Sequence, residues 1–436
     1  MDHLDVTDSR TGKDYKIPID NGYINAADVA KIIASESGLE SVTEQDSKYE
    51  QPLRILSKGF ENTAVVESSI THIDGKRGII RYRDYDIEQL FHEYVFEDVM
   101  HLLIWGSLPS QAEKDHVRAL LCHAMNPPES VRKVVEAFPR NADVLAMTSA
   151  TLSAFGATDE TVVASHQTPK PLFQGRLDVA DGALVRLMAF HASTVALIYC
   201  HKYKKDFTPP EPGRSLIGNL LWMMGVSQVN PKAEECLNKL WILYADHEMT
   251  NSTAAVLHLG SSLLDPVFSG LGGIIASYGP LHGGAILLAY NQLAMMGKPE
   301  FVPAYVEDLK RKNRRVYGYG HRIYKTRDPR LGLIEELMET YQDEVNANPL
   351  VRVASALDKY ASEDPYFVER KLQANADLKG CFLYTALGFE PDMILAITGI
   401  SRAAGCMAHW RESLTQPMKL WRPLQKYTGS APAQAA

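Results

Sequence analysis

The sequence predicts an all-α fold. From residue 89 onward, apolar residues recur at the 3.6-residue spacing of amphipathic helices rather than alternating as they do in strands. Alternating, β-type runs are confined to residues 64–87, where Asp74-Gly75 marks a turn between them. The chain has 436 residues, which is long for one hydrophobic core, so we expect two or three domains.

The elements follow in chain order. Residues 1–55 are polar and mixed, with one short amphipathic helix expected at 26–35. Apolar periodicity then predicts further helices at 89–105, 110–125, 130–137, 143–154, 182–203, 232–245, 251–264, 265–278, 286–296, 304–312, 329–345, 349–360, 377–387 and 391–410. The helix at 329–345 has the clearest start, because Asp328 can cap it and Pro329 fits its first position.

Composition excludes several classes of protein. The chain is 45% hydrophobic and 22% charged, with a net charge of −8, which gives no general electrostatic attraction to nucleic acid or membranes. The five cysteines are scattered without CxxC spacing, as expected for reduced thiols inside a cell. The acidic N-terminus is unlike a secretory or transit peptide, and the most apolar stretch, 184–199, contains Arg186 and His191. We therefore expect a cytoplasmic protein without a membrane span.

Four motifs carry side chains suited to chemistry. They are ADHEM with His247, GPLHGGA with His282, VYGYGH with His321 and NAD with Asp377. Metal binding of the HExxH type fails because position 251 is asparagine, so we expect no metal site. The chain has no GxSxG nucleophile motif, and the glycine pair at 318 and 320 is too short for a dinucleotide fingerprint.

The motifs suit a pocket that binds a small di-acid and transfers protons. Besides the three histidines, three arginines can hold carboxylates bidentately: Arg330, Arg402 and Arg422. Asp377, near a helix N-terminus, should stay ionised and could act as a general base. A neutral His282 at a helix start could donate a hydrogen bond to the developing enolate. The basic run 310–315 is either a solvated helix end or an attraction for an anionic cofactor.

On these motifs, in this order, the chain resembles the citrate synthase family. The segments THIDGKRGIIRYRDYDIEQL and FEDVMHLLIWGSLP resemble its N-terminal signature, and the likeness extends from about Ser69 onward. It implies a citrate synthase-like, two-domain helical fold with a small N-terminal β-containing segment. It also implies a homodimer in which a large domain (1–284, then 390–436 with a C-terminal arm) and a mobile small domain (285–389) close over oxaloacetate before acyl-CoA binds.

The resemblance also implies residue roles. Asp377 would take the α-proton of the acyl thioester, His282 would stabilise the enol(ate) oxygen, and His321 would protonate the carbonyl oxygen of oxaloacetate. Oxaloacetate would be held by His247, Arg330 and Arg402, with Arg422 reaching in from the neighbouring subunit. Coenzyme A is a co-substrate rather than a permanently bound cofactor. The residues expected to bind it are Arg315, Val316, Tyr317, Gly318, Tyr319, Gly320 and Lys325.

Three departures from the family pattern concern the acyl substrate. Ile286-Leu287 stands where the family has a polar pair, Leu378-Lys379-Gly380 where it has residues such as FYS or AHS, and Tyr244 where histidine is common. The first two departures add apolar surface and remove bulk at Gly380, which should open space for an acyl chain. An apolar pocket gains about 0.8 kcal/mol per buried CH₂, so we expect an acyl donor longer than acetyl and an alkylcitrate synthase-like activity. The acyl-pocket candidates are Ile286, Leu287, Leu378 and Gly380.

Three alternatives stay open at this point. The departures could be packing changes in an ordinary acetyl-CoA citrate synthase, or the enzyme could be a 2-methylcitrate synthase. The chain could also be a non-catalytic relative that binds coenzyme A or a di-acid.

Overall fold

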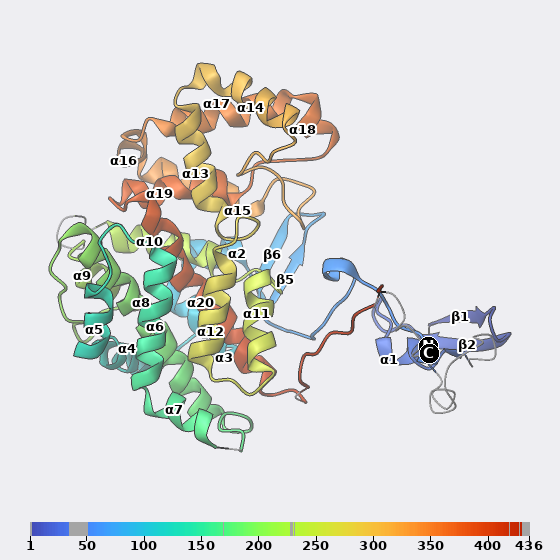
Figure 1. Cartoon of the computed structure of the whole chain (residues 1–436). Helices are drawn as coiled ribbons and strands as arrows, with labels where there is room; N and C mark the ends of the chain where they lie inside the picture. The colour runs from blue at the N-terminus through green and yellow to red at the C-terminus, as the bar shows by residue number, and fades with distance from the viewer. Residues whose placement is uncertain are drawn as a thin grey trace, which may run out of the picture. The chain divides into compact units, whose positions relative to one another are not determined.

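The computed structural model describes residues 2–34, 51–168, 170–226, 230, 232–417, 419–426 and 428–429. Helices make up most of this part of the chain, and the strands within it form three small antiparallel sheets (Figure 1). The predicted all-α class is therefore confirmed. The contacts divide the chain into two compact units, one of residues 1–67 with 422–436 and one of residues 68–421.

The first unit contains a β-hairpin that the sequence analysis did not predict. Strands β1 (His3–Asp8) and β2 (Lys13–Pro18) pair in antiparallel register. The expected helix at 26–35 is shorter, since α1 is Ala26–Val29 and β3 (Ile33–Ala34) follows to pair with β4 (Gln51–Pro52). Residue 35 lies outside the described residues. The helix ends early because the chain after α1 is used in another way. Ile32 is buried in one cluster with Ile17 and Val29, and the next two residues pair with β4 as a strand.

The second unit opens with the predicted β-type segment. Strands β5 (Thr71–Asp74), β6 (Ile79–Tyr82) and β7 (Tyr85–Asp86) form one antiparallel sheet. The helices that follow are α2 (Ile87–Glu93), α3 (Phe96–Trp105), α4 (Gln111–Ala124), α5 (Glu129–Glu136), α6 (Val144–Thr158), α7 (Glu160–Gln167), α8 (Leu177–Tyr203), α9 (Leu216–Met223), α10 (Ala233–Tyr244), α11 (Asn251–Gly260) and α12 (Pro266–Ser277).

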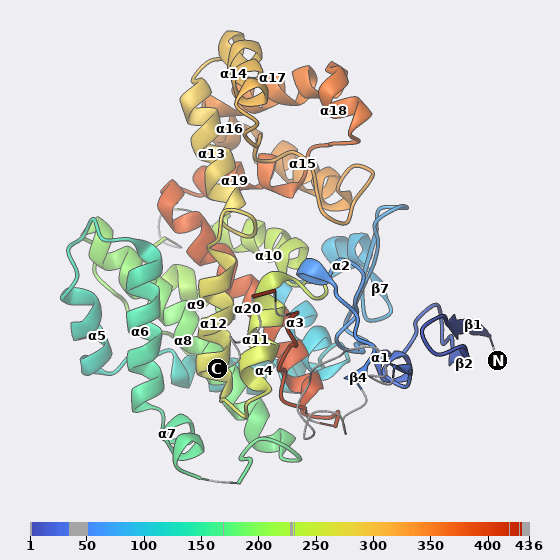
Figure 2. The same cartoon turned by 45° about the vertical axis from the view of Figure 1, so that its right-hand side comes forward.

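A second group of helices lies together at one end of this unit in both views (Figures 1 and 2). Its members are α13 (Ala285–Met296), α14 (Val302–Arg311), α15 (Pro329–Thr340), α16 (Gln342–Asn346), α17 (Leu350–Glu363), α18 (Pro365–Glu369) and α19 (Ala376–Ala386). The last helix, α20 (Ile394–Ser413), returns to pack on α3, α8 and α11. The domain boundaries expected at 285 and 389 stay a prediction.

Two predicted helices are broken in the structure. The one expected at 89–105 divides at Tyr94, because the Asp98 carboxylate accepts a hydrogen bond from the Val95 N–H (3.2 Å) and the Asn238 side chain accepts one from the Phe96 N–H (3.1 Å). These side chains start a new helix. The one expected at 329–345 divides at Tyr341 into α15 and α16.

Helix α8 lies at the centre of the core, between α4, α6 and α20. Of the unbroken helices in the described ranges, it is the one long and apolar enough to cross a membrane by length and composition. However, 94% of its most apolar window is buried inside the protein. Such burial on all sides is typical of a core helix.

Candidate active site

The turn that carries His247 follows the end of α10 and is held by α20. Gly405 of α20 makes this approach possible, because a Cβ there would lie 2.3 Å from Oδ1 of Asp246. The other oxygen of Asp246 accepts a hydrogen bond from the Glu248 N–H (3.0 Å) and lies 3.3 Å from Nε2 of His409. Glu248 has a left-handed φ of 55°. The Asp246 carboxylate therefore fixes the backbone that directly follows His247.

His247 itself is buried and neutral. Its Nε2 lies 2.8 Å from the hydroxyl of Tyr324, and its ring centroid is 5.2 Å from that of His321. Burial lowers its pKa well below the usual value, and the charges of Arg330 and Arg402 lower it further. The ring can therefore exchange hydrogen bonds with a bound anion without adding a charge of its own.

His282 lies in the turn between α12 and α13. Its Nε2 lies 3.3 Å from the backbone N–H of Ser252 and 2.8 Å from the hydroxyl of that residue, in the first turn of α11. A backbone N–H can only donate, so Nε2 is an acceptor and the neutral ring carries its proton on Nδ1. Burial, followed by the charge of Arg402, lowers the pKa of His282 to about 4. Neutrality was expected from the start of α13, but burial and the charge of Arg402 are what produce it.

In His321 the nitrogen that carries the proton is the opposite one from that in His282. Its Nδ1 accepts hydrogen bonds from the backbone N–H groups of Ile323 (3.1 Å) and Tyr324 (3.4 Å), which leaves the proton on Nε2. Burial, followed by the charge of Arg330, lowers the pKa of His321 to about 4. The site thus holds two neutral histidines, one with an Nδ1–H donor and the other with an Nε2–H donor.

Asp377 is the second residue of α19, which Asn375 caps. A helix N-terminus favours the ionised carboxylate and would lower its pKa. Burial outweighs this effect, and the Asp377 pKa rises to about 6 even though Arg330 and Arg402 lower it. The carboxyl is therefore mostly ionised at neutral pH, as expected, and is more basic than the helix position alone indicates.

The two predicted arginines of this unit differ in their partners. Arg330 is buried and makes two hydrogen bonds to Asp328, from Nε (3.0 Å) and from Nη2 (2.7 Å). Nη1 of Arg402 is buried with no hydrogen-bond partner among the described residues. A buried guanidinium nitrogen without a partner is costly unless an anion binds there. Arg402 is therefore the clearest anion-binding group of the site.

The glycine-rich segment at 316–320 is attached to the start of α19. Gly318 and Gly320 adopt left-handed φ values of 83° and 81°. The Asn375 N–H donates to the Gly318 carbonyl (2.9 Å), and the Gly320 N–H donates to the Gln373 carbonyl (2.8 Å). The segment predicted to bind coenzyme A therefore lies beside the backbone that leads into Asp377. Within this segment, Val316, Tyr317 and Tyr319 are half-buried.

Some residues of the basic run 310–315 fit a solvated helix end, and others fit an attraction for an anionic cofactor. Lys310 pairs with Glu307 and Asp364, and Arg311 and Lys312 both pair with Asp308. Arg314 and Arg315 are exposed without an ion pair among the described residues, and Lys325 is also exposed. Arg422 belongs to the other unit, so its expected role across a subunit interface stays a prediction.

The acyl-pocket candidates are mostly occupied by the protein itself. Ile286 and Leu378 are buried in the core, whereas Leu287 is half-exposed. A Cβ on Gly380 would lie 2.2 Å from the hydroxyl oxygen of Tyr244. The expectation that Gly380 opens space is therefore wrong for this structure, because the side chain of Tyr244 fills that space.

Sequence reasoning missed Ser252, Tyr324 and Asp328 as members of the site. Asp328 was visible as a helix cap, but its pairing with Arg330 was not. For Ser252 and Tyr324 the sequence held no signal, because their contacts join segments far apart along the chain.

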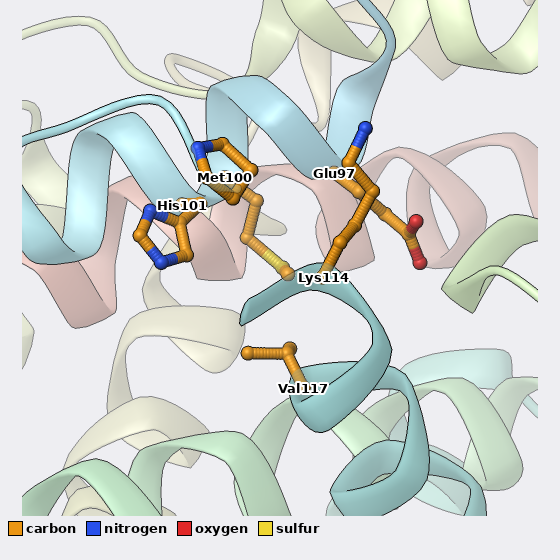
Figure 3. Close-up of a pocket in the computed structure, with 6 residues that line it drawn as sticks. Glu97, Met100, His101, Lys114 and Val117 are labelled. Atoms are coloured by element: carbon orange, nitrogen blue, oxygen red, sulfur yellow. The ribbon is translucent and has the colours of Figure 1, made fainter. Parts of the chain in front are cut away.

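A small cavity elsewhere in this unit offers little to a ligand. Figure 3 shows a cavity between α3 and α4 with a volume of about 10 Å³, which is room for about one water molecule. Its charged side chains are already paired, Glu97 with Arg118 (2.7 Å) and Lys114 with Asp98 (2.6 Å). In the part of the chain that the structure describes, no group of three or more His, Cys, Asp or Glu side chains is placed to hold a metal ion.

The match to a family model decides the affiliation of the chain. Residues 59–424 match the model of the citrate synthase C-terminal domain. The chain belongs to the citrate synthase family. The motifs that carry His247, His282, His321 and Asp377 all lie within the matched residues.

Relatives in the family are named for different activities. The chain is 42% identical to a citrate synthase-like protein of a Phoma species, over 98% of this chain and 90% of that protein. It is 34% identical to an alkylcitrate synthase of Talaromyces stipitatus, over 98% and 94%. Its fold matches that of the Thermoplasma acidophilum citrate synthase, solved with carboxymethyl coenzyme A and oxaloacetate, with a TM-score of 0.79, 26% identity, and coverage of 88% and 98%.

Proposed function

We propose that this protein condenses an acyl-CoA with oxaloacetate and hydrolyses the resulting thioester to release coenzyme A. One observation carries the proposal: His282 and His321 are neutral with defined donor nitrogens, the carboxyl of Asp377 has a pKa of about 6, and the charge of Arg330 or Arg402 acts on each of the three. Such a set can remove a weakly acidic proton and hold the negative charge that develops. Membership of the citrate synthase family supports the same reaction.

The reaction assigns one proton or hydrogen bond to each group. The Asp377 carboxylate takes the α-proton of the acyl thioester, and the Nδ1–H of His282 donates a hydrogen bond to the enolate oxygen. The α-carbon then bonds to the keto carbon of oxaloacetate, whose oxygen takes its proton from Nε2 of His321. Water cleaves the thioester, giving a third carboxylate and the thiol of coenzyme A. Neutral donors suit this sequence because the charge to be stabilised appears only during the reaction.

The binding groups complete the proposal. Arg402, with its unpartnered nitrogen, and Arg330 would hold the carboxylates of oxaloacetate beside His247. The segment 316–320, with the exposed Arg315 and Lys325, would bind coenzyme A, whose phosphates attract unpaired cations. Closure of residues 285–389 over the substrates, a homodimer that contributes Arg422 and a cytoplasmic location belong to the same proposal.

For the acyl group we infer a chain longer than acetyl. Two relatives at 33% and 34% identity are alkylcitrate synthases. In the structure the support comes from Leu287, a half-exposed apolar residue in the first turn of α13. Gly380 gives no support, since Tyr244 fills the space beside it. Acetyl-CoA and propionyl-CoA are the alternative donors. Turnover measured with each acyl-CoA separates them from a longer donor.

The test is oxaloacetate-dependent thiol release from acetyl-, propionyl-, hexanoyl- and decanoyl-CoA, with product masses measured. We expect the highest kcat/KM with a longer chain, and a loss of at least about 100-fold in kcat for D377N, because a general base typically contributes 10²- to 10⁴-fold. D343N, which changes an exposed aspartate of α16, is the matched control.

Each outcome separates one part of the proposal. A clear preference for acetyl-CoA contradicts the long-chain inference alone. Equal rates for D377N and the unaltered protein contradict the role of Asp377. Coenzyme A binding without any oxaloacetate-dependent release contradicts the reaction and favours a non-catalytic member of the family.

A further inference from the structure

The residue directly before Asp377 is held at both of its backbone polar groups. The Ala376 N–H donates to Oδ2 of Asp328 (3.2 Å), and the Ala376 carbonyl accepts a hydrogen bond from the hydroxyl of Tyr244 (3.2 Å). The N–H of Asp377 itself donates to the side chain of Asn375 (3.0 Å). Side chains from α10, from the cap of α15 and from the cap of α19 therefore meet at the first turn of α19.

The hydroxyl of Tyr244 reaches that carbonyl only because residue 380 is glycine. A Cβ at this position would lie 2.2 Å from the hydroxyl oxygen, 3.3 Å from Cζ of Tyr244 and 3.7 Å from Cδ1 of Ile334. Carbon and oxygen atoms that are not bonded do not approach to 2.2 Å, so any side chain here would displace the hydroxyl. The ring carbon and Ile334 would tolerate a methyl group with little movement.

Tyr244 also contacts the group expected to bind oxaloacetate. The guanidinium carbon of Arg330 lies 5.8 Å from the centroid of the Tyr244 ring, within the range of a cation–π interaction. Burial raises the pKa of the Tyr244 hydroxyl well above its usual value, so the group stays protonated and remains a hydrogen-bond donor. One side chain thus supports both a carboxylate-binding residue and the backbone next to the proton acceptor.

We propose that Tyr244, lying in the space left by Gly380, is a positioning residue that holds Asp377 at the reacting carbon. This inference rests on the proposed function. Tyr244 would act through the Ala376 carbonyl and would not touch substrate. An error of about 1 Å in the position of a reacting group can lower the rate by about 100-fold, so losing this hydrogen bond should affect the chemical step more than binding.

The experiment is a double-mutant cycle on Tyr244 and Gly380, with the substrate that the unaltered protein turns over best. Y244F removes the hydroxyl and keeps the ring under Arg330. We expect kcat to fall about tenfold or more while KM for oxaloacetate and for acyl-CoA changes less than about twofold. G380A should lower kcat similarly, because its methyl group displaces the same hydroxyl.

The double variant distinguishes positioning from simple packing. In Y244F the atom that clashes with a methyl at 380 is gone, so Y244F/G380A should have the kcat of Y244F alone, which is a strongly non-additive result. The control is Y384F. Tyr384 is also a buried tyrosine, but it lies on α19, two turns beyond Asp377. It should keep kcat within about twofold of the unaltered protein. Melting temperatures of all variants show which of them fold.

The results separate this inference from the proposed function. An unaltered kcat in Y244F, or additive effects of Y244F and G380A, overturns the role of Tyr244 and leaves the reaction standing. Absence of oxaloacetate-dependent turnover in the unaltered protein overturns both. If G380A fails to fold, Y244F alone still decides the matter through its kcat and KM values.

Discussion

Two buried aspartates hold backbone and side chains of the site, and their partners differ. Asp246 faces His409 and holds the backbone of Glu248, whereas Asp328 pairs with Arg330 and holds the backbone of Ala376. Burial alone would raise the pKa of either carboxyl, but His409 beside Asp246 and Arg330 beside Asp328 lower it. Of the two, only Asp328 is bonded to a side chain predicted to bind substrate, so we expect a change at Asp328 to affect turnover more than a change at Asp246.

The largest expected effect is the loss of turnover in D328N, compared with the loss of stability in D246N. D328N leaves Arg330 without its carboxylate and weakens the hold on Ala376, so kcat/KM for oxaloacetate should fall by about 100-fold or more. D246N removes the partner of a buried imidazole, and breaking such a pair costs about 3–5 kcal/mol of stability. Steady-state kinetics and denaturant unfolding of both variants check this. A larger loss of turnover in D246N, with D328N unaffected, would contradict the comparison.

A second prediction concerns the pH dependence of turnover. Asp377 must be ionised to accept a proton, and its pKa in the free protein is about 6, so kcat/KM should fall about tenfold per pH unit below pH 6. Both catalytic histidines have pKa values near 4 and stay neutral over that range. A kcat/KM–pH profile for the acyl-CoA between pH 5 and 8.5 measures the acid limb. A limb that survives in D377N would have to come from another group.

The smallest effect is expected in the pH dependence of stability. Burial alone would lower the pKa of His409, but the charge of Asp246, its hydrogen bond to the ring and the charge of Glu412 together raise it. Its contribution is therefore complete below the unfolded pKa of about 6.5 and is lost as pH rises through the folded pKa. The melting temperature should accordingly decline on the alkaline side, and H409Q should flatten this decline by a few degrees. The Asp328–Arg330 pair does not titrate there, so R330Q should leave the slope unchanged.

Much of the helical fold was predictable because apolar spacing records which face of each helix is buried. The breaks at Tyr94 and Tyr341 were not, since that spacing continues across both of them. At Tyr94 the cause is tertiary: Asn238, from a distant helix, bonds to the N–H of Phe96. The hairpin of β1 and β2 was missed because its side chains are mostly polar and exposed, so its apolar alternation is weak.

At the site, the sequence predicted residue types but not their states. His282 and His321 were recognisable from their motifs, yet the protonated nitrogen of each depends on backbone groups at Ser252 and Ile323. The sequence also could not predict whether the pKa of Asp377 is raised or lowered, because burial raises it and the helix terminus lowers it. Gly380 was misinterpreted as open space because nothing in one segment shows which distant side chain fills it.

The contact between Tyr244 and Gly380 restricts the order in which the two positions can change during evolution. While tyrosine occupies 244, any side chain at 380 meets its hydroxyl, so a change at 380 is accessible only after 244 has become smaller. A smaller residue at 244, on the other hand, leaves a cavity that costs stability until 380 is filled. Phenylalanine at 244 would avoid both the clash and the cavity, because it removes the hydroxyl and keeps the ring, so it is the step through which the two positions can change together.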